Sequence, residues 1–454
     1  MLMSINGSSV SVAFPIIITE LNTTLVIAGW VMSGFQLVNT IVMPVAGKLS
    51  EIIGRKNSFI LHVLLFTAGS ILASISGNIY MLIGARIIQA TGGGGFLPCA
   101  TGIVSDLFPD KRQRYIGFFT SIFPIGMIIG PNAGGWLVDT LGWRSIFWVN
   151  IPLCLLVLLL GWWLLPSRKD AIKHSLDVIG AGLLFAGVAS FMFAITSISN
   201  IITSHKWTVT LFLIGLSILL IIFFLRYESK SAEPLISLKI LRERPFLAAN
   251  IFNFFYGFGA LGIFSLIPLY VMTVYQKSAL ESGFIITGRS FGMIFASTLT
   301  SMYIMKWGYR RPMLIGTLVI AIGIFLLTLK LPSGNENFFL NITSLLFMIL
   351  ILCGLGAGTS APAANNACIE LMPEHVATIT GLRGMFRNLG SAIGVSVTTV
   401  VVNSFQNKVT AFNVVFYSLV ALMIILMIPA IFNMPSSPTD CRFTGENTDK
   451  RHTL

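Results

Sequence analysis

Long apolar stretches separated by short polar breaks recur along almost the whole chain. A helix needs roughly twenty consecutive apolar residues to cross the hydrocarbon core of a bilayer, and the stretches reach that length. The pattern predicts an all-α polytopic membrane protein with about 14 transmembrane helices. The predicted spans are 1–19, 25–47, 57–76, 79–104, 114–137, 144–165, 176–199, 207–226, 246–273, 282–305, 312–330, 339–362, 379–403 and 410–432.

The composition excludes a soluble domain. Hydrophobic residues make up 55% of the chain and charged residues only 10%, a balance that a water-facing surface cannot accommodate at this length. Short connections also leave no room for an extramembrane catalytic domain. Two longer polar segments stand out, 227–245 and the tail 434–454. The first mixes charges with Ile and Leu and is typical of an amphipathic piece on the inner leaflet.

The formal net charge of +12 does not indicate nucleic-acid binding, because the basic residues are not gathered on one face or tail. They lie in alternate loops, and the positive-inside rule then places both termini in the cytoplasm. The five cysteines form no disulfide framework and no metal-ligand spacing. The first span lacks a charged start and a small-residue cleavage site, so we expect it to remain in the protein.

A weak internal repeat indicates two related halves. The loop from Gly47 to Lys56 and the loop from Ser301 to Arg311 each end in a glycine followed closely by two basic residues, and a span follows each loop. Such repeats commonly flank a binding site near the middle of the bilayer. The predicted parts are a six-helix bundle (1–165), two extra spans with the amphipathic segment (166–245), a second six-helix bundle (246–433) and the tail (434–454).

The segment from Gly126 to Leu137 interrupts an otherwise smooth apolar span. Pro131 cannot donate the backbone hydrogen bond that would hold the preceding turn, and glycines allow a neighbouring backbone to approach closely. The pattern favours a hinge in a tightly packed, rocking helix, and an ordinary kinked helix is the alternative. The glycines are Gly126, Gly130, Gly134 and Gly135.

Four segments together resemble the major facilitator superfamily, and specifically its fourteen-span drug:proton antiporter branch, the EmrB/QacA type. The segment Arg86 to Gly95 resembles the fourth-helix motif, Gly126 to Leu137 the fifth-helix antiporter motif, and Gly142 to Pro152 the entry to the sixth helix. The loop that joins the second and third spans carries the fourth likeness. Its matching residues are Gly47, Gly54, Arg55 and Lys56, with Glu51 where an aspartate is usual.

The resemblance implies a secondary transporter that exports small amphipathic compounds by alternating access, in exchange for protons. It implies the cell membrane, no cofactor and no metal, and a periplasmic adaptor if the source is a double-membraned bacterium. The first span departs from the family pattern, because Asn6 stands where an aspartate is usual. An amide cannot take up a proton near neutral pH, so coupling must use another group or be absent.

Ionisable residues inside spans are costly and are functional candidates by default. Arg86 lies deep in the fourth span with Gln89 on nearly the same face, which favours a cavity-facing or helix-bridging role over bonds to backbone carbonyls alone. Arg289 is a weaker candidate. Arg383 and Arg387 share one helix face and fit either an inner gate or a lipid-headgroup contact. A lone histidine such as His62 is more typical of packing than of a proton relay.

No acidic residue lies in the middle of a predicted span, and the acids nearest the membrane are Glu51, Asp106, Asp139, Glu281 and Glu370. We expect Glu51 to join a cytoplasmic charge network and Asp106 to pair at a helix end. The aromatic run from Phe252 to Tyr256 and the pair Phe35 and Gln36 suit flat organic molecules, including cations, although lipid-facing rings are the alternative for most of them. The expected substrate and coupling residues are Asn6, Gln36, Arg86, Gln89, Asn253, Tyr256 and Arg289.

Two other functions remain open at this point. One keeps the fold but makes the protein a uniporter or an exporter of anionic metabolites, favoured by buried arginines and the absence of a mid-span acid. The other is a non-transporting membrane protein, such as a channel or an intramembrane enzyme. The chain has no Walker loop, no metal-ligand spacing and no paired carboxylates within a span, so we expect no enzyme. The two-half organisation disfavours a channel.

Overall fold

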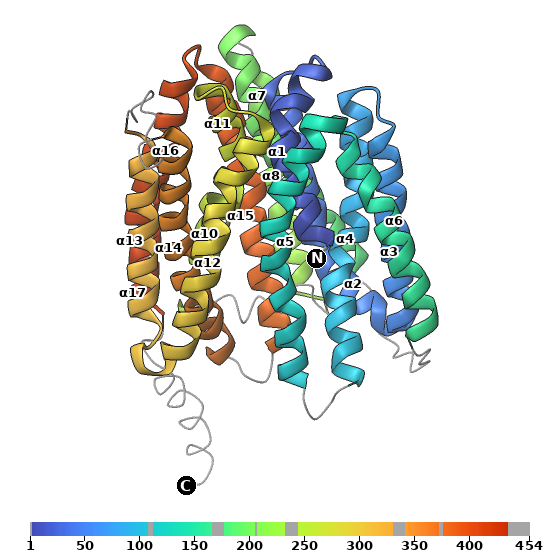
Figure 1. The fold of residues 1–454 in the computed structure, drawn as a ribbon. Helices are drawn as coiled ribbons and strands as arrows, with labels where there is room; N and C mark the ends of the chain where they lie inside the picture. Colours follow the sequence, from blue (N-terminus) through green and yellow to red (C-terminus); the bar gives the residue numbers. More distant parts are fainter. Residues whose placement is uncertain are drawn as a thin grey trace. The chain divides into compact units, whose positions relative to one another are not determined.

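The computed structural model of the protein describes residues 2–107, 112–165, 177–204, 207–231, 244–329, 341–371 and 376–434, and these residues form helices and short turns without a strand (Figure 1). The all-α prediction is confirmed for this part of the chain. The helices are α1 (Leu2–Glu20), α2 (Leu25–Ile52), α3 (Arg55–Ser74), α4 (Ile79–Leu107), α5 (Arg112–Leu141), α6 (Ser145–Leu164), α7 (Val178–Ser204), α8 (Thr208–Glu228), α10 (Arg244–Tyr256), η2 (Gly257–Gly262), η3 (Ile263–Leu266), α11 (Ile267–Val274), α12 (Ala279–Trp307), α13 (Arg310–Leu327), α14 (Ile342–Leu371), α15 (Val376–Ser404), α16 (Lys408–Leu422), η6 (Met423–Met427) and α17 (Ile428–Phe432).

Within the described residues, 12 segments are long and apolar enough to cross a membrane. They correspond to 12 of the predicted spans, with the segment from Arg244 to Val274 counted as one. The other two predicted spans fall on α5 and α12, which are 30 and 29 residues long but are not among the 12. The count of 14 therefore stays a prediction.

Short polar motifs fix where several helices begin. The first backbone N–H groups of a helix have no intrahelical partner, so a side-chain oxygen that accepts from one of them stabilises the start. Thr24 accepts from the Ile27 N–H, and Asn78 from the Met81 N–H at 2.9 Å. At α12, Ser278 Oγ accepts from the Glu281 N–H while Glu281 accepts from the Ser278 N–H, a reciprocal capping box with both bonds at 3.1 Å.

The chain packs into two compact units. The first unit contains Met1–Leu238, Gly262–Gly283 and Ser391–Lys408, and the second contains Lys239–Leu261, Phe284–Gly390 and Val409–Leu454. Two stretches of the predicted second bundle, 262–283 and 391–408, thus belong to the first compact unit. The halves predicted from the repeat stay a prediction. The boundary at 261/262 falls inside a single span, in the segment where the α-helix is interrupted.

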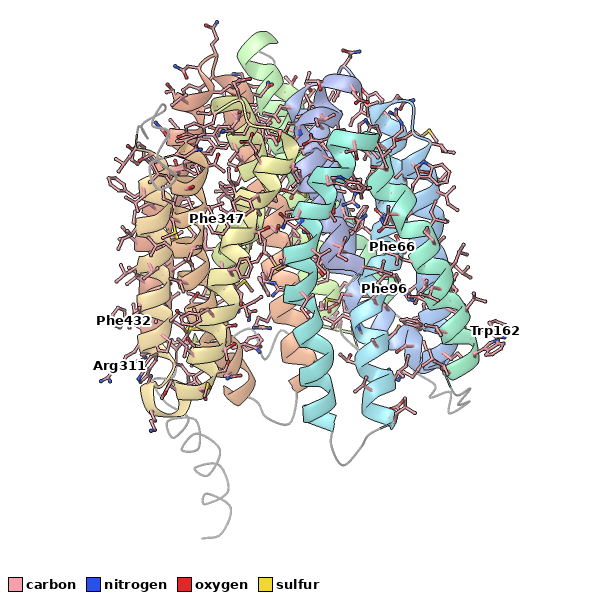
Figure 2. All side chains as sticks on the ribbon, in the orientation of Figure 1. Phe66, Phe96, Trp162, Arg311, Phe347 and Phe432 are labelled. Carbon is pink, nitrogen blue, oxygen red and sulfur yellow. The ribbon has the colours of Figure 1, made fainter. Side chains whose placement is uncertain are left out.

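In the first unit, α4 is the central helix and packs against both α2 and α3. Glycines make the approach to α3 close, because a Cβ at Gly92 would collide with the backbone of Phe66 and His62. The rings of Phe66 and Phe96 pack 5.2 Å apart in the same interface (Figure 2). His62 is 2% exposed, and its Nδ1 lies 2.7 Å from the Ser58 carbonyl oxygen. That environment is one of packing.

The two extra helices α7 and α8 pack on each other, and α7 contacts α2. Trp30 of α2 stacks on Phe193 with ring centroids 4.2 Å apart and donates its indole N–H to Thr196 Oγ1. Ser197 and Thr210 join α7 to α8 through a hydroxyl–hydroxyl hydrogen bond of 2.7 Å. The pair is therefore attached to the first unit through α2. The predicted amphipathic segment beyond residue 231 and the tail beyond residue 434 lie outside the described residues.

In the second unit, α12 and α14 interlock through their glycines. A Cβ at Gly292 would collide with the Ile351 carbonyl oxygen, and one at Gly354 would collide with the Arg289 carbonyl oxygen. Phe284 and Phe347 stack across the same pair of helices with centroids 4.8 Å apart, and Phe347 is labelled in Figure 2. The glycine run of α14 thus serves close packing, and α14 continues as one helix through Pro362.

Candidate functional site

Arg86 is the most deeply buried arginine or lysine among the described side chains of the first unit, with 2% of its surface exposed. It lies on α4 and reaches two neighbouring helices. Its Nε donates to the Val31 carbonyl oxygen of α2 at 3.2 Å, and its Nη1 donates to Asn6 Oδ1 of α1 at 2.6 Å. Nη1 also donates to Gln89 Oε1 at 2.5 Å, one turn along α4. Arg86 therefore bridges helices and also uses a backbone carbonyl, which combines both roles considered from the sequence.

Every one of these acceptors is neutral. Removing a guanidinium ion from water costs several kcal/mol, and hydrogen bonds to a charged group return about 1.5–3 kcal/mol each. The rings of Phe35 and Phe147 lie 3.9 and 6.0 Å from the guanidinium carbon. A desolvated cation–π contact adds roughly 2 kcal/mol. The aromatic residue of the predicted Phe35–Gln36 pair thus contacts the arginine and does not face lipid.

Gln89 extends the network to α3. Its Nε2 donates to Ser70 Oγ at 2.8 Å, and Ser70 Oγ donates to the Phe66 carbonyl oxygen at the same distance. Gln89 and Ser70 are both 0% exposed. Four helices, α1 to α4, therefore meet in one chain of hydrogen bonds around Arg86. The sequence indicated Arg86 and Gln89, whose spacing of three is visible along one helix, but Ser70 carries no sequence signal.

Asn6 is 1% exposed, and its two side-chain atoms have different surroundings. Oδ1 accepts from Arg86, whereas the buried Nδ2 has no hydrogen-bond partner in the described part of the chain. Because Arg86 can only donate, the oxygen must face it, and the amide cannot be turned around. Gln36 does not join this network. It is half-buried, and none of the described hydrogen bonds uses its side-chain amide.

The other three predicted substrate residues lie in the second unit. Asn253 and Tyr256 are 4% and 7% exposed on α10, where Tyr256 stacks on Phe252. Arg289 of α12 is 8% exposed. Three arginines interact electrostatically with the Tyr256 hydroxyl, namely Arg289, Arg383 and Arg387. The structure thus brings Tyr256 within electrostatic range of these three arginines.

The span that begins with α10 is interrupted, which the sequence analysis did not foresee. A π-helical turn, Gly257–Gly262, and a 3₁₀ turn, Ile263–Leu266, separate α10 from α11. Interrupted helices leave carbonyl groups that need other donors. Arg289 Nη2 donates to the Ala260 carbonyl oxygen, and Ser11 Oγ of α1 donates to the Ser265 carbonyl oxygen. The three glycines of the π turn are the only sequence signal.

The predicted loop motif between α2 and α3 forms a compact polar turn. Gly54 has a φ of 88°, a conformation that favours glycine. Arg55 Nη1 donates to Ser50 Oγ at 2.7 Å, and Arg55 Nε lies 3.4 Å from Asp106 Oδ2 at the end of α4. Asp106 is therefore a helix-end charge partner, as expected. Lys56 Nζ donates to the Trp162 carbonyl oxygen at 2.7 Å, beside the exposed ring labelled in Figure 2.

The structure gives less information on two other residues of this loop motif, Gly47 and Glu51. Gly47 has open surroundings, since the nearest atom to an added Cβ, Pro98 Cβ, would be 4.0 Å away. The Glu51 side chain lies outside the described residues, so its place in a charge network stays a prediction.

The glycine-rich segment of α5 packs backbone against backbone on two sides. On one side lies α1, where a Cβ at Gly134 would be 2.6 Å from Ser9 Cβ, and Ser9 Oγ donates to the Gly130 carbonyl oxygen at 2.8 Å. On the other lies the start of α12, where a Cβ at Gly135 would be 2.7 Å from the Ala279 carbonyl oxygen. Helix α5 continues through Pro131 without a break, and Gly126 is buried. The close packing is as predicted, and the hinge stays a prediction.

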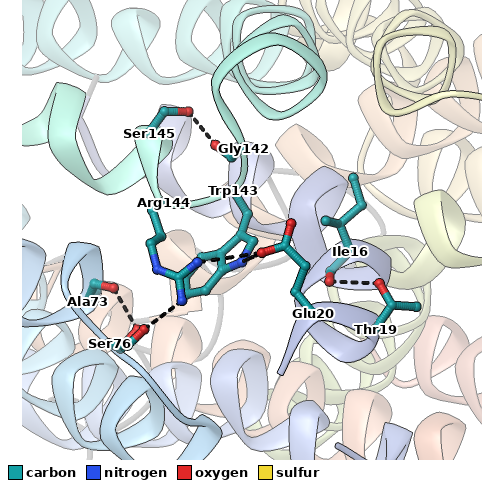
Figure 3. A network of polar contacts seen from close by, with 9 residues as sticks. All are labelled: Ile16, Thr19, Glu20, Ala73, Ser76, Gly142, Trp143, Arg144 and Ser145. Atoms are coloured by element: carbon teal, nitrogen blue, oxygen red, sulfur yellow. Dashed lines mark hydrogen bonds and ion pairs between the residues drawn. The ribbon is translucent and has the colours of Figure 1, made fainter. Parts of the chain in front are cut away.

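A further polar network, which the sequence analysis missed, holds one end of the first unit together (Figure 3). Glu20 Oε2, at the end of α1, accepts from Trp143 Nε1 at 2.9 Å and lies 3.5 Å from Arg144 Nη1. Arg144 Nη2 donates to the Ser76 carbonyl oxygen at 2.9 Å, and the Arg144 guanidinium lies over the Trp143 ring. The turn that orients the side chains of Trp143 and Arg144 contains Gly142, whose φ is 78°.

Comparison with known proteins agrees with this fold. The sequence model of the Major Facilitator Superfamily matches residues 1–284 and 249–451. Multidrug transporter protein MdtP of Bacillus subtilis is 30% identical over 404 residues, covering 88% of this chain and 73% of that protein. Multidrug resistance protein 3 of the same organism is 31% identical over 392 residues, covering 84% of this chain and 73% of that protein.

Solved structures show the same fold at low sequence identity. A crystal structure of the peptide transporter POT has a TM-score of 0.65 and 18% identity, covering 96% of this chain and 94% of that one. The xylose transporter XylE from E. coli has a TM-score of 0.59 and 14% identity, covering 94% and 95%. The match of the family model over nearly the whole chain, together with the Bacillus relatives, establishes that this protein belongs to the Major Facilitator Superfamily.

Proposed function

We propose that the protein is a multi-pass transporter of the cell membrane that exports small amphipathic organic compounds of several kinds by alternating access. It is a secondary transporter and not an enzyme, in keeping with its family and its relatives. The observation that carries the proposal is the alignment with two proteins named for multidrug transport or resistance over more than four-fifths of this chain. The aromatic and amide groups beside the buried cations fit such substrates.

The coupling ion in this proposal is the proton, moving inward as substrate moves out. Asn6 cannot carry it, because an amide does not titrate near neutral pH. The described carboxylates lie at helix ends, as at Glu20, Asp106 and Asp139. One such group, or an acid outside the described residues, would have to bind the proton. The basic loops support cytoplasmic termini. The four motif segments support membership of the fourteen-span antiporter branch.

One observation favours a second candidate function, a carrier without proton coupling that accepts anionic metabolites. The described contacts of Arg86 are all with neutral groups, and three arginines interact electrostatically with Tyr256 in the second unit. Fixed positive charge in a membrane protein attracts anions. We rank this function below export by antiport, because the named relatives are multidrug proteins. The proposal includes a periplasmic adaptor as partner only if the source is a double-membraned bacterium.

The experiment is dye efflux from cells that express the protein, compared with cells that carry the empty vector. Cells are loaded with ethidium, and its loss is followed by fluorescence with the cellular ATP level held constant. We expect faster efflux with the protein and a return to the vector rate when a protonophore collapses the proton gradient. Continued fast efflux after collapse would favour the uncoupled carrier, and no efflux of any tested amphipathic dye would reject the export function.

A further inference from the structure

We infer that Arg86 and Asn6 together bind a compact, singly charged anion. The first reason is two hydrogen-bond donors, on two side chains that contact each other, that the described hydrogen bonds do not use. The described hydrogen bonds of Arg86 employ its Nε and Nη1 but not its Nη2. Asn6 Nδ2 has no partner, although the residue is 1% exposed. An unsatisfied buried donor costs about as much as a lost hydrogen bond, and a bound ion is one arrangement that satisfies it.

The second reason is charge. Arg86 contacts two side-chain amides, one carbonyl and two aromatic rings, and none of these groups carries a negative charge. An acidic side chain at position 6 would accept from Arg86, neutralise the guanidinium and remove the unpaired Nδ2 donor. The amide at this position leaves the guanidinium charge without an anionic partner and Nδ2 without an acceptor. A single negative charge placed against Arg86 Nη2 and Asn6 Nδ2 would supply both.

The surroundings select the kind of anion. Desolvation rises steeply with ionic charge, and only one guanidinium is present to compensate it. Phe35 and Phe147 add apolar walls that cannot solvate a second charge. A halide or the carboxylate of an amphipathic molecule fits these limits, and sulfate does not. The shared chemistry is one negative charge that accepts two N–H donors. In its carboxylate form the inference rests on the proposed export function, and in its halide form it does not.

The test is the thermal unfolding midpoint of the purified protein in gluconate buffer, with chloride, bromide, acetate or sulfate added at matched ionic strength. Binding to the native state raises the midpoint, and saturation by a monovalent anion is expected to raise it by about 2–4 °C. Sulfate should do no more than gluconate. Asn6→Asp supplies the charge from within, so this variant should unfold at a higher midpoint and lose the response.

Asn6→Ala is the matched control. It removes the orphan donor but leaves Arg86 without a negative charge, so it should keep the response with an affinity reduced about tenfold or less. A response of Asn6→Asp equal to that of the wild type, or no response of the wild type to any monovalent anion, overturns the inference. These readouts involve no transport, so they can succeed where dye export fails.

A second arm separates the two sources of the charge. Radioactive chloride bound to the wild type is challenged with an aromatic carboxylate and with the corresponding neutral amide. If a halide is the resident anion, replacing chloride by gluconate on both sides of proteoliposomes should slow dye transport, and the carboxylate should compete poorly. If the substrate supplies the charge, the carboxylate should displace chloride where the amide does not, and transport should persist in gluconate. Failure of chloride to bind and of the carboxylate to raise the midpoint contradicts both forms.

Discussion

Gly92 and Gly84 lie on the same helix, α4, but their surroundings are opposite. A Cβ at Gly92 would collide with the backbone of Phe66 and His62, whereas nothing lies within 4 Å of a Cβ at Gly84. Backbone atoms cannot move aside as the end of a flexible side chain can. Gly92 is therefore needed for close packing between helices, whereas Gly84 affects only the local helix propensity. The sequence pattern alone does not distinguish these two roles.

We predict that Gly92→Ala destabilises the protein by about 1–3 kcal/mol, because it forces α3 and α4 apart. Gly84→Ala should be neutral or stabilising by up to about 1 kcal/mol, because alanine favours a helix more than glycine does. The measurement is reversible unfolding in detergent, with the midpoint in denaturant as the readout. Equal losses for the two variants would mean that α3 and α4 do not approach as closely as the structure indicates.

The same distinction explains what could be inferred about single residues. Arg86 and Gln89 were predictable because their depth in a span and their spacing are local features. The acceptor of Arg86 on α1 and the partner of Gln89 on α3 come from positions 80 and 19 residues away, and only the fold brings them together. Glu20 and Trp143 meet in the same way, since a carboxylate at the end of a helix gives no sign of its partner. The orphan amide of Asn6 is likewise a property of packing.

At the scale of helices, apolar length predicted most elements correctly, because burial in lipid requires it. The interruption after Tyr256 was not predictable, since π and 3₁₀ turns depend on donors from other helices, here Ser11 and Arg289.

The start of α12 depends both on local sequence and on a contact with another helix. The Ser278 and Glu281 capping box is local, whereas Asp139 Oδ2 of α5 accepts from the Leu280 N–H at 2.8 Å. Burial raises the pKa of Glu281, but its hydrogen bonds with Lys277 and Ser278 outweigh that effect, so the pKa lies below its usual value.

We predict that Asp139→Ala loosens the first turn of α12 and costs about 0.5–2 kcal/mol, the range observed when a helix loses a capping oxygen. Asp139→Asn keeps an acceptor oxygen and should lose much less. Amide hydrogen exchange at residues 280–283 is the measurement, since the effect is local. Exchange that rises equally in both variants would show that the charge of Asp139 matters more than its hydrogen bond.

At the scale of the whole molecule, α5 belongs to the first predicted bundle and the start of α12 to the second, yet both pack within one compact unit. Their backbones meet at Gly135 and at Gly283, whose added Cβ would collide with the Pro131 carbonyl oxygen. A secondary transporter must expose its site to each side of the membrane in turn, which requires bundles to move against each other. We therefore predict that the contact between α5 and α12 opens once in every transport cycle.

A covalent link across this contact tests that requirement. In a background with the native cysteines replaced, Asp139→Cys and Leu280→Cys are joined by a short bifunctional thiol reagent, and dye efflux is measured before and after. We predict that the link abolishes efflux while the unlinked double variant still transports.

The control is Ser197→Cys with Thr210→Cys. In the native chain these two hydroxyls lie 2.7 Å apart between α7 and α8, two helices that need not separate. Efflux should survive that link, because α7 and α8 pack on each other and α7 is attached to α2 through the Trp30–Thr196 hydrogen bond. If transport continued with residues 139 and 280 joined, α5 and the start of α12 would have to travel as one body, and the division between moving parts would lie elsewhere in the chain.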